Sequence, residues 1–253
     1  MNDLIATKLK SLKLSGISKT FDIRNDEAIK EGLSYVEFFE LLLNDETANR
    51  VTNARAKKMH NAKFPNHKTI EEYNFNYQPN LNKKEIYNLA TCEFIRNKEN
   101  IAFIGPSGTG KTHLSIAIGI NAISQGYSVL FTTVNQMLEE LYMSRADNSY
   151  MKKINKYVNP DLLILDELGL KKLSQNNIDD FYEIISKRYE NGSIIVTSNK
   201  KFDEWGKIFY DPVLATAILD RFIHHCNFVV IDGESYRMKQ RQEKLNGLKN
   251  NPI

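Results

Sequence analysis

Residues 103–115, FIGPSGTGKTHLS, place three glycines, a proline and a lysine between two apolar segments. Glycine tolerates backbone conformations that other residues avoid, so this composition predicts a tight, irregular turn. The residues before it, IAFIG, predict a short buried strand, and residues 111–125 predict a helix that ends at Gly126. A strand, a glycine-rich loop and a helix in this order favour an α/β architecture.

The same alternation continues to the end of the chain. Further strands are expected at SVLFTTV, LLILDE, SIIVTSN and NFVVID. Helices are expected from an Asn135 cap to about Arg145, over about 149–157, along the apolar face from Ile178 to Tyr189, and from Pro212. Because these strands are apolar throughout and separated by helices, we expect a parallel sheet with helices on both faces.

The first 75 residues are predicted to be helical. Ser34 and Glu37 have the spacing of a capping box, and the helix that follows is expected to end at Pro65. Residues 76–84 are polar and predict a linker. The expected organisation is a helical N-terminal domain over 1–75, this linker, an α/β domain over 85–240 and a basic tail over 241–253.

The composition excludes several classes of protein. The two cysteines, Cys92 and Cys226, are far apart, so neither a disulfide framework nor a zinc-binding spacing is indicated. The N-terminus lacks the apolar core of a signal peptide, and no run of 18 apolar residues exists. A cytoplasmic protein that is not associated with a membrane is expected.

The glycine-rich stretch matches a phosphate-binding motif. Residues Gly105, Pro106, Ser107, Gly108, Thr109, Gly110, Lys111 and Thr112 fit G-x-x-x-x-G-K-[ST], the P-loop. Its amides are expected to surround phosphates at the positive end of the following helix. Lys111 should reach the β- and γ-phosphates of ATP, Thr112 should bind Mg²⁺, and His113 is included in the predicted site. A turn that binds nothing is disfavoured by the strand and helix around it.

Polar residues at the ends of two strands and on a later helix indicate hydrolysis. Asp166 is expected to hold Mg²⁺ and Glu167 to polarise the attacking water, the alternative being a solvated strand end. Asn199 is suited to orienting that water, although an ordinary strand-ending Asn is the alternative. Arg221 is a candidate arginine finger, and a surface ion pair with Asp220 or another neighbour is its alternative.

Together these segments resemble AAA+ ATPases of the initiator and helicase-loader branch. More narrowly, the chain resembles the IstB family, the helper ATPases of bacterial insertion-sequence transposition. The resemblance is carried by GPSGTGKTHLSIAIG, PDLLILDELG, SIIVTSNKKFDEWGKIFYDPVLATAILDRFIHH and GESYRMKQR, with LSYVEFFELLLNDE and AKFPNHKTIEEYNF near the N-terminus. These segments extend over nearly the whole chain.

The resemblance implies a role for each matching residue. Gly105 to Thr112 would be the Walker A loop, Asp166 and Glu167 the Walker B pair, and Asn199 the sensor 1 residue. Arg221 would act in trans on the ATP of a neighbouring copy, and Arg237 would be the sensor 2 arginine. Only residues 222–253 follow Arg221, which is too few for a full C-terminal helical lid. A finger in trans implies a homo-oligomer whose activity rises faster than linearly with concentration.

Two basic segments are candidate DNA contacts. The stretch 50–68 contains no acid and six cations: Arg50, Arg55, Lys57, Lys58, Lys63 and Lys68. The second segment carries Arg145, Lys152, Lys153 and Lys156, where the resemblance implies an extra helix that lines a central channel. A solvated helix face, or a contact with acids of a neighbouring subunit, is the alternative for the first segment.

The resemblance implies an ATPase that assembles on double-stranded DNA and assists a transposase. A replicative helicase loader that acts with a helicase and single-stranded DNA is the alternative. A nucleotide-gated DNA scaffold with negligible turnover also stays open, although Glu167 disfavours it. A small-molecule kinase is disfavoured because no acceptor-site signature accompanies the P-loop.

Overall fold

The computed structural model describes residues 2–249, except for the side chains of residues 175, 176 and 243–249. The chain divides into two compact units, Met1–Lys58 and Met59–Ile253. Residues 59–75, grouped by the sequence analysis with the N-terminal domain, therefore belong to the second unit. Of the expected tail over 241–253, residues 250–253 lie outside the described residues.

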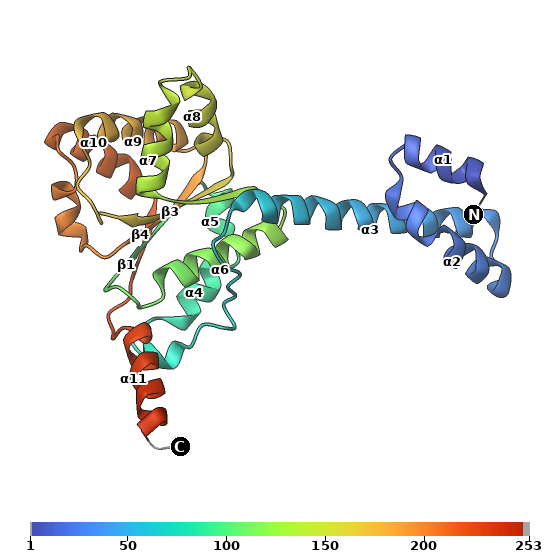
Figure 1. Ribbon diagram of the computed structural model, residues 1–253, viewed down its shortest axis with the longest axis horizontal. Helices are drawn as coiled ribbons and strands as arrows, with labels where there is room; N and C mark the ends of the chain where they lie inside the picture. Colours follow the sequence, from blue (N-terminus) through green and yellow to red (C-terminus); the bar gives the residue numbers. More distant parts are fainter. Residues whose placement is uncertain (1, 250–253) are drawn as a thin grey trace. The chain divides into compact units, whose positions relative to one another are not determined.

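The first unit consists of helices α1 (Asp3–Ser11), α2 (Ser15–Glu31) and the start of α3 (Tyr35–Ala62) (Figure 1). The predicted capping box at α3 is confirmed. The Glu37 amide donates to Ser34 Oγ over 3.3 Å, and the Ser34 amide donates to Glu37 Oε2 over 2.8 Å. These reciprocal bonds satisfy amides that the first turn of a helix otherwise leaves unpaired.

Polar contacts join α2 to α3. Glu46 is buried on α3 and accepts hydrogen bonds from the Gly16 and Ile17 amides at 2.6 and 3.2 Å, so it caps the N-terminus of α2. Arg24 donates two hydrogen bonds to Asp45, at 2.8 and 2.9 Å, which lowers the pKa of that carboxyl to about 2. A paired carboxylate of this kind favours the fold above the ordinary carboxyl pKa, and its contribution is lost as the pH falls toward 2.

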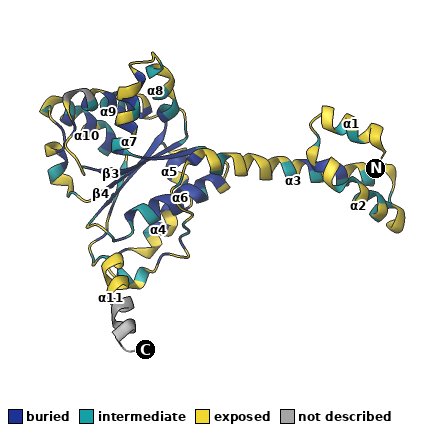
Figure 2. Cartoon of the chain, viewed as in Figure 1, coloured by how far each residue is buried: buried dark blue, intermediate teal, exposed yellow. Residues whose placement is uncertain are grey.

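The second unit is built on a five-stranded parallel sheet in the order β2-β3-β4-β1-β5. Its strands are β1 (Asn100–Ile104), β2 (Val129–Thr133), β3 (Leu162–Leu168), β4 (Ser193–Ser198) and β5 (Cys226–Val230). Figure 1 labels the inner strands β3, β4 and β1. The inner strands are almost entirely buried (Figure 2). This confirms the predicted parallel sheet.

Helices cover both faces of the sheet, because alternate strand residues point to opposite sides. On β1, Ile101 and Phe103 join a core with α4 (Lys83–Leu89), α5 (Glu93–Arg96) and α6 (Lys111–Ser124). Ala102 and Ile104 join the opposite core, whose helices are α7 (Val134–Ser144), α8 (Tyr150–Val158), α9 (Gln175–Arg188) and α10 (Pro212–Ile223).

Short elements complete the second unit. Two 3₁₀ helices, η1 (Phe75–Tyr77) and η2 (Phe202–Lys207), lie in its connecting segments. Between β5 and residue 249 the structure describes the single helix α11 (Tyr236–Lys249). Among the described residues, no helix has both the length and the apolar character needed to cross a membrane.

Two local expectations differ from the structure. Thr133, rather than Asn135, caps α7, because Thr133 ends β2 in an extended conformation and its hydroxyl accepts from the Gln136 amide at 3.1 Å. Residues 76–84 were expected to be a polar linker, but Gln78 and Leu81 are buried. Leu81 joins the core beside α4, so this segment packs against the second unit instead of spanning open solvent.

Arg188 is an unusual component of the core, since it is 1% exposed. Its guanidinium donates to the carbonyls of Tyr157, Val158, Pro160, Asp161 and Ser193. Burial lowers its pKa to about 10, so the side chain still carries its charge at neutral pH. The end of α9 is thereby tied to the starts of β3 and β4, the two strands that lead into the candidate site.

Candidate functional site

A cavity of about 570 Å³ lies beside the P-loop in the second unit. It is lined by the P-loop from Ser107 to Thr112, by His113, and by Glu167, Asn199 and Arg237. Residues that are distant in sequence thus meet at the carboxyl ends of parallel strands, where ligands bind in open α/β sheets. Three of the predicted site residues do not line the cavity: Gly105, Pro106 and Asp166. Each contacts a residue that does, since Gly105 and Pro106 accept hydrogen bonds from Lys111 and Asp166 accepts one from Thr112.

The P-loop backbone is closely packed on both sides. Gly110 has φ 97°, and a Cβ there would lie 2.4 Å from the Tyr73 ring. Gly108 has φ 83°, and a Cβ there would lie 2.2 Å from Ser235 Oγ. Only glycine fits positions that combine a left-handed backbone with this crowding. The loop is therefore held in its curled form by segments on either side of it in the fold.

Lys111 begins α6 and folds back over the loop. Its Nζ donates to the carbonyls of Gly105 and Pro106, both at 2.7 Å. Burial lowers the pKa of this ammonium group, and the charge of Arg237 acts in the same direction, while Asp166 opposes both. A phosphate group offers stronger acceptors than these carbonyls, so the position is suited to binding an anionic ligand.

Asp166 is the buried acid of the candidate site, with an exposed fraction of 6%. Thr112 Oγ1 donates to its carboxylate, 2.9 Å from Oδ1 and 3.1 Å from Oδ2. Thr197 Oγ1 donates to Oδ1 at 2.5 Å. A carboxylate beside a threonine hydroxyl supplies the hard oxygen ligands that Mg²⁺ prefers, so these residues fit the predicted metal site.

Glu167 differs from Asp166 in both backbone and exposure. It lies where the pairing of β3 with β4 is irregular, between Leu165 and Leu168, and its φ is 66°. A bulge redirects side chains, and here Glu167 is exposed and lines the cavity while Asp166 stays buried. Left-handed backbone is uncommon for glutamate and is often found at functional positions. The bulge thus gives adjacent acids two different environments.

Thr197 connects the two acids and was not singled out by the sequence analysis. Besides its bond to Asp166, its Oγ1 accepts the Glu167 amide at 3.0 Å. Its side chain is 1% exposed and lies in β4, two residues before Asn199. Thr197 also lines the cavity, and its hydroxyl holds the carboxylate of Asp166 and the backbone of Glu167 in place. The available sequence signal was a hydroxyl residue directly after the apolar run IIV of this strand.

We expect Thr197→Val to lower kcat for ATP hydrolysis by about 10- to 100-fold. The substitution removes a hydrogen bond to the charged Asp166 while leaving the side-chain volume nearly constant. Such a bond contributes about 1.5–3 kcal/mol of free energy, which corresponds to this loss in rate. Phosphate release at saturating ATP measures it. Thr197→Ser keeps the hydroxyl and should recover most of the activity. Equal activity of the Val and Ser variants would contradict a positioning role.

The rim of the cavity contains further residues that the sequence analysis missed. Tyr73 donates through its hydroxyl to the Thr109 carbonyl at 2.9 Å, and the Tyr236 amide donates to the Gly108 carbonyl at 3.0 Å. The Tyr77 and Tyr236 rings meet edge to face at 4.8 Å. His113 Nε2 bonds to the Thr69 carbonyl at 2.7 Å. The segment around residues 65–78 thus forms one wall, although its composition had predicted only the end of a helical region and a linker.

The two candidate arginines have different locations. Arg237 lines the cavity with the P-loop of its own chain. Arg221 is not among the lining residues; its guanidinium lies 5.3 Å from the centre of the Tyr182 ring, and Nη1 donates to the Ala217 carbonyl at 3.0 Å. Instead, Arg221 lines a separate small cleft with Tyr189, Glu190 and His225.

Several cations expected to bind DNA are paired within the protein. Arg50 lies 2.8 Å from Glu46, and Arg145 lies 2.6 Å from the fully buried Asp180. Lys153 and Lys156 both contact Glu140. These partners reduce the positive charge that the segment from Arg145 to Lys156 presents, whereas its Lys152 is exposed.

Comparisons with known proteins identify a matching family and similar sequences. The family described as IstB-like ATP binding protein matches residues 7–244. The chain is 38% identical over 242 residues to the protein described as an ATP-binding protein of insertion sequence IS5376 in Geobacillus stearothermophilus, covering 96% of each chain. It is 36% identical to the corresponding IS21 protein of Pseudomonas aeruginosa, covering 93% of this chain and 89% of that one.

Solved structures show the same fold at lower identity. The crystal structure of DnaI superposes with a TM-score of 0.57 at 22% identity, over 65% of this chain and 91% of that one. The replication initiator DnaA, bound to AMPPCP and single-stranded DNA, superposes with a TM-score of 0.53 at 24% identity, over 72% of this chain and 55% of that one. These likenesses establish an AAA+ fold.

Proposed function

Because the chain belongs to the IstB-like family of insertion-sequence ATP-binding proteins, we propose that it is a Mg²⁺-dependent ATPase that assembles on duplex DNA and assists a transposase. The observation that carries the hydrolytic part is the cavity that combines the P-loop with Glu167 and Asn199. The link to transposition rests on the names of the relatives. The chain would act in the cytoplasm, where its DNA is found.

The described contacts support a separate role for each residue around the triphosphate of ATP. Lys111 would exchange its bonds to the loop carbonyls for bonds to the β- and γ-phosphates. Thr112 and Asp166 would hold Mg²⁺, which neutralises charge on the phosphates. Glu167 would take a proton from the attacking water, and Asn199 would orient that water, since both line the cavity. Arg237 would add positive charge from the same chain.

One cation that this chemistry needs is supplied by a neighbouring copy in our proposal. Arg221 does not line the cavity of its own chain. A finger from an adjacent copy would therefore complete each site, and hydrolysis would depend on assembly. Of the expected N-terminal domain over 1–75, residues 1–58 would contribute DNA binding and contacts between copies. Residues 59–84 would belong with the ATPase domain over 85–240, and 241–253 would form the basic end of the chain.

We expect neutralisation of Arg55, Lys57 and Lys58 to weaken duplex DNA binding and to flatten its dependence on salt. Each lost phosphate contact should reduce the slope of log affinity against log salt concentration by ~0.9, so three contacts give about 2.7. Fluorescence anisotropy over a series of salt concentrations measures the slope. A control in which Lys8, Lys10 and Lys13 become Gln removes the same charge from α1 and the residues just after it. If both triple variants changed the slope equally, α3 would not be a specific contact.

A replicative helicase loader is the second candidate, favoured by the structural likeness to DnaI. A loader of this kind would prefer single-stranded DNA, whereas our proposal requires assembly on duplex DNA. Comparing the affinities for a duplex and for one of its strands, with a non-hydrolysable ATP analogue, separates the two functions. A strong preference for the single strand would overturn the proposed role with a transposase.

A further inference from the structure

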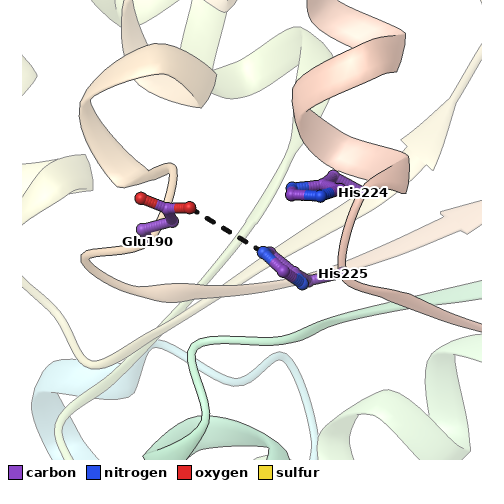
Figure 3. A group of neighbouring side chains, drawn as sticks. All are labelled: Glu190, His224 and His225. Carbon is purple, nitrogen blue, oxygen red and sulfur yellow. Dashed lines mark ion pairs between the residues drawn. The ribbon is translucent and has the colours of Figure 1, made fainter.

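Two histidines and a glutamate form a compact group apart from the nucleotide cavity. Glu190 lies in the turn after α9, and His224 and His225 lie between α10 and β5 (Figure 3). One ligand atom from each lies within 4.8 Å of the other two, and Glu190 Oε1 is 3.8 Å from His225 Nε2. We propose that these three residues bind a divalent transition metal ion, and that Zn²⁺ fits them best.

The ligand types support zinc. Two imidazole nitrogens and one carboxylate oxygen are a set used by three-residue zinc sites, with a fourth position left for water. Bonds of about 2.0–2.2 Å in a tetrahedral arrangement place neighbouring ligand atoms about 3.3–3.6 Å apart. The 3.8 Å separation of Glu190 and His225 is close to this range. Because Glu190 and His224 are exposed, small side-chain rotations suffice to bring all three atoms onto one ion.

Tyr189 supplies an outer contact of the kind that metal-binding histidines require. Its hydroxyl is 2.8 Å from His224 Nδ1. Its ring stacks on both imidazoles, with interplanar angles of 28° for His224 and 21° for His225. With Nδ1 of His224 engaged by the tyrosine, Nε2 is the nitrogen that would bind the ion.

The backbone adds a second, independent observation at the carboxylate. Glu190 has φ 58°, a left-handed conformation in which glycine is the usual residue at the end of a helix. Non-glycine residues in this region carry strain and are enriched at functional positions. In this backbone conformation, the Glu190 carboxylate faces the imidazole of His225.

The position of this metal site beside Arg221 predicts an effect on ATP hydrolysis, an inference that rests on the proposed function. His225 and Glu190 line the same small cleft as Arg221, the proposed finger on α10. An ion that links the turn after α9 to the end of α10 would restrict the helix that carries Arg221. Zinc would then alter hydrolysis in the assembled state while leaving ATP binding to dilute single copies unchanged.

Calorimetric titration of Zn²⁺ into the full-length protein after chelator treatment, without ATP or DNA, tests the site directly. We expect one ion per chain, and at least ~10-fold weaker binding in each of Glu190→Gln, His224→Gln and His225→Gln. Tyr189→Phe should weaken binding by about 10-fold through loss of the outer contact. Bound Co²⁺ should show the intense visible absorption of tetrahedral coordination. His60→Gln removes an exposed histidine of α3 outside the group and should bind Zn²⁺ like the wild type.

The proposal fails if the wild type takes up no Zn²⁺ in this titration, or if His60→Gln loses as much affinity as the site variants. Circular dichroism and ATP binding show whether each variant is folded. Because the titration contains neither ATP nor DNA, its result is independent of the proposed function. Zinc binding without any effect on assembly-dependent hydrolysis would overturn only the link to Arg221.

Discussion

Glu167→Gln is expected to lower ATP hydrolysis by about 10²- to 10⁴-fold, the usual contribution of a general base. The substitution keeps the size of the side chain and removes only the proton acceptor. Glu167 lines the cavity, and its amide rather than its carboxylate bonds to Thr197, so the hydrogen bonds described at Asp166 should survive. ATP and Mg²⁺ should therefore still bind, and phosphate release should be almost abolished.

The same variant should accumulate as an ATP-bound assembly on duplex DNA. If hydrolysis resets the complex, blocking that step leaves the bound state as the end point. Native gels or negative-stain images of the variant with ATP and duplex DNA would show it, with wild type plus a non-hydrolysable analogue as the reference. Equal phosphate release by wild type and variant would remove Glu167 from the chemistry and favour a scaffold with negligible turnover.

Asp166→Asn provides a matched comparison one residue away. Asp166 is buried, and Thr112 Oγ1 lies within hydrogen-bond distance of both of its oxygens. An amide there replaces one acceptor oxygen with a donor NH₂ group and removes the negative charge that would hold Mg²⁺. We therefore expect Asp166→Asn to weaken Mg²⁺-dependent ATP binding as well as turnover. Glu167→Gln should affect turnover alone. A nucleotide titration of the two variants, with and without Mg²⁺, separates holding the metal from activating the water.

The parts of the fold that follow from local pattern were predictable from the sequence. The strands are buried on both faces and therefore apolar throughout, which is why LLILDE and SIIVTSN predicted the parallel sheet. The P-loop was predictable because its glycines meet a backbone requirement that few other residues satisfy. Asp166 and Asn199 could be placed at one edge of the sheet because parallel strands end on the same side.

Features that depend on distant contacts were not predictable in the same way. Whether the polar segment 76–84 spans solvent or packs depends on the pocket that receives Gln78 and Leu81. The buried Arg188 is explained only by the carbonyls that converge on it from α8, from Asp161 just before β3, and from β4. Thr197 gains its role from a bulge in the neighbouring strand, which no spacing within β4 reveals.

Arg221→Ala is expected to lower ATPase activity by about 10³- to 10⁵-fold in the assembled protein, the range typical of an arginine finger. The described contacts of Arg221, to the Tyr182 ring and the Ala217 carbonyl, are within its own surroundings and outside the nucleotide cavity. ATP binding to a single copy should therefore be unchanged. Activity measured over a range of protein concentrations should rise faster than linearly for the wild type and stay near zero for the variant.

Mixing two inactive variants tests whether the finger acts between copies. Lys111→Ala loses the phosphate-binding ammonium group but keeps Arg221, whereas Arg221→Ala keeps the P-loop. In a mixed assembly, a P-loop from an Arg221→Ala copy can face a finger from a Lys111→Ala copy and form a complete site. Activity should therefore reappear on mixing, with a maximum near equal amounts, and a double variant carrying both substitutions should restore none. If every mixture stayed inactive while both variants still assembled on DNA, the finger would not act in trans, and the dependence of hydrolysis on assembly would lose its physical basis.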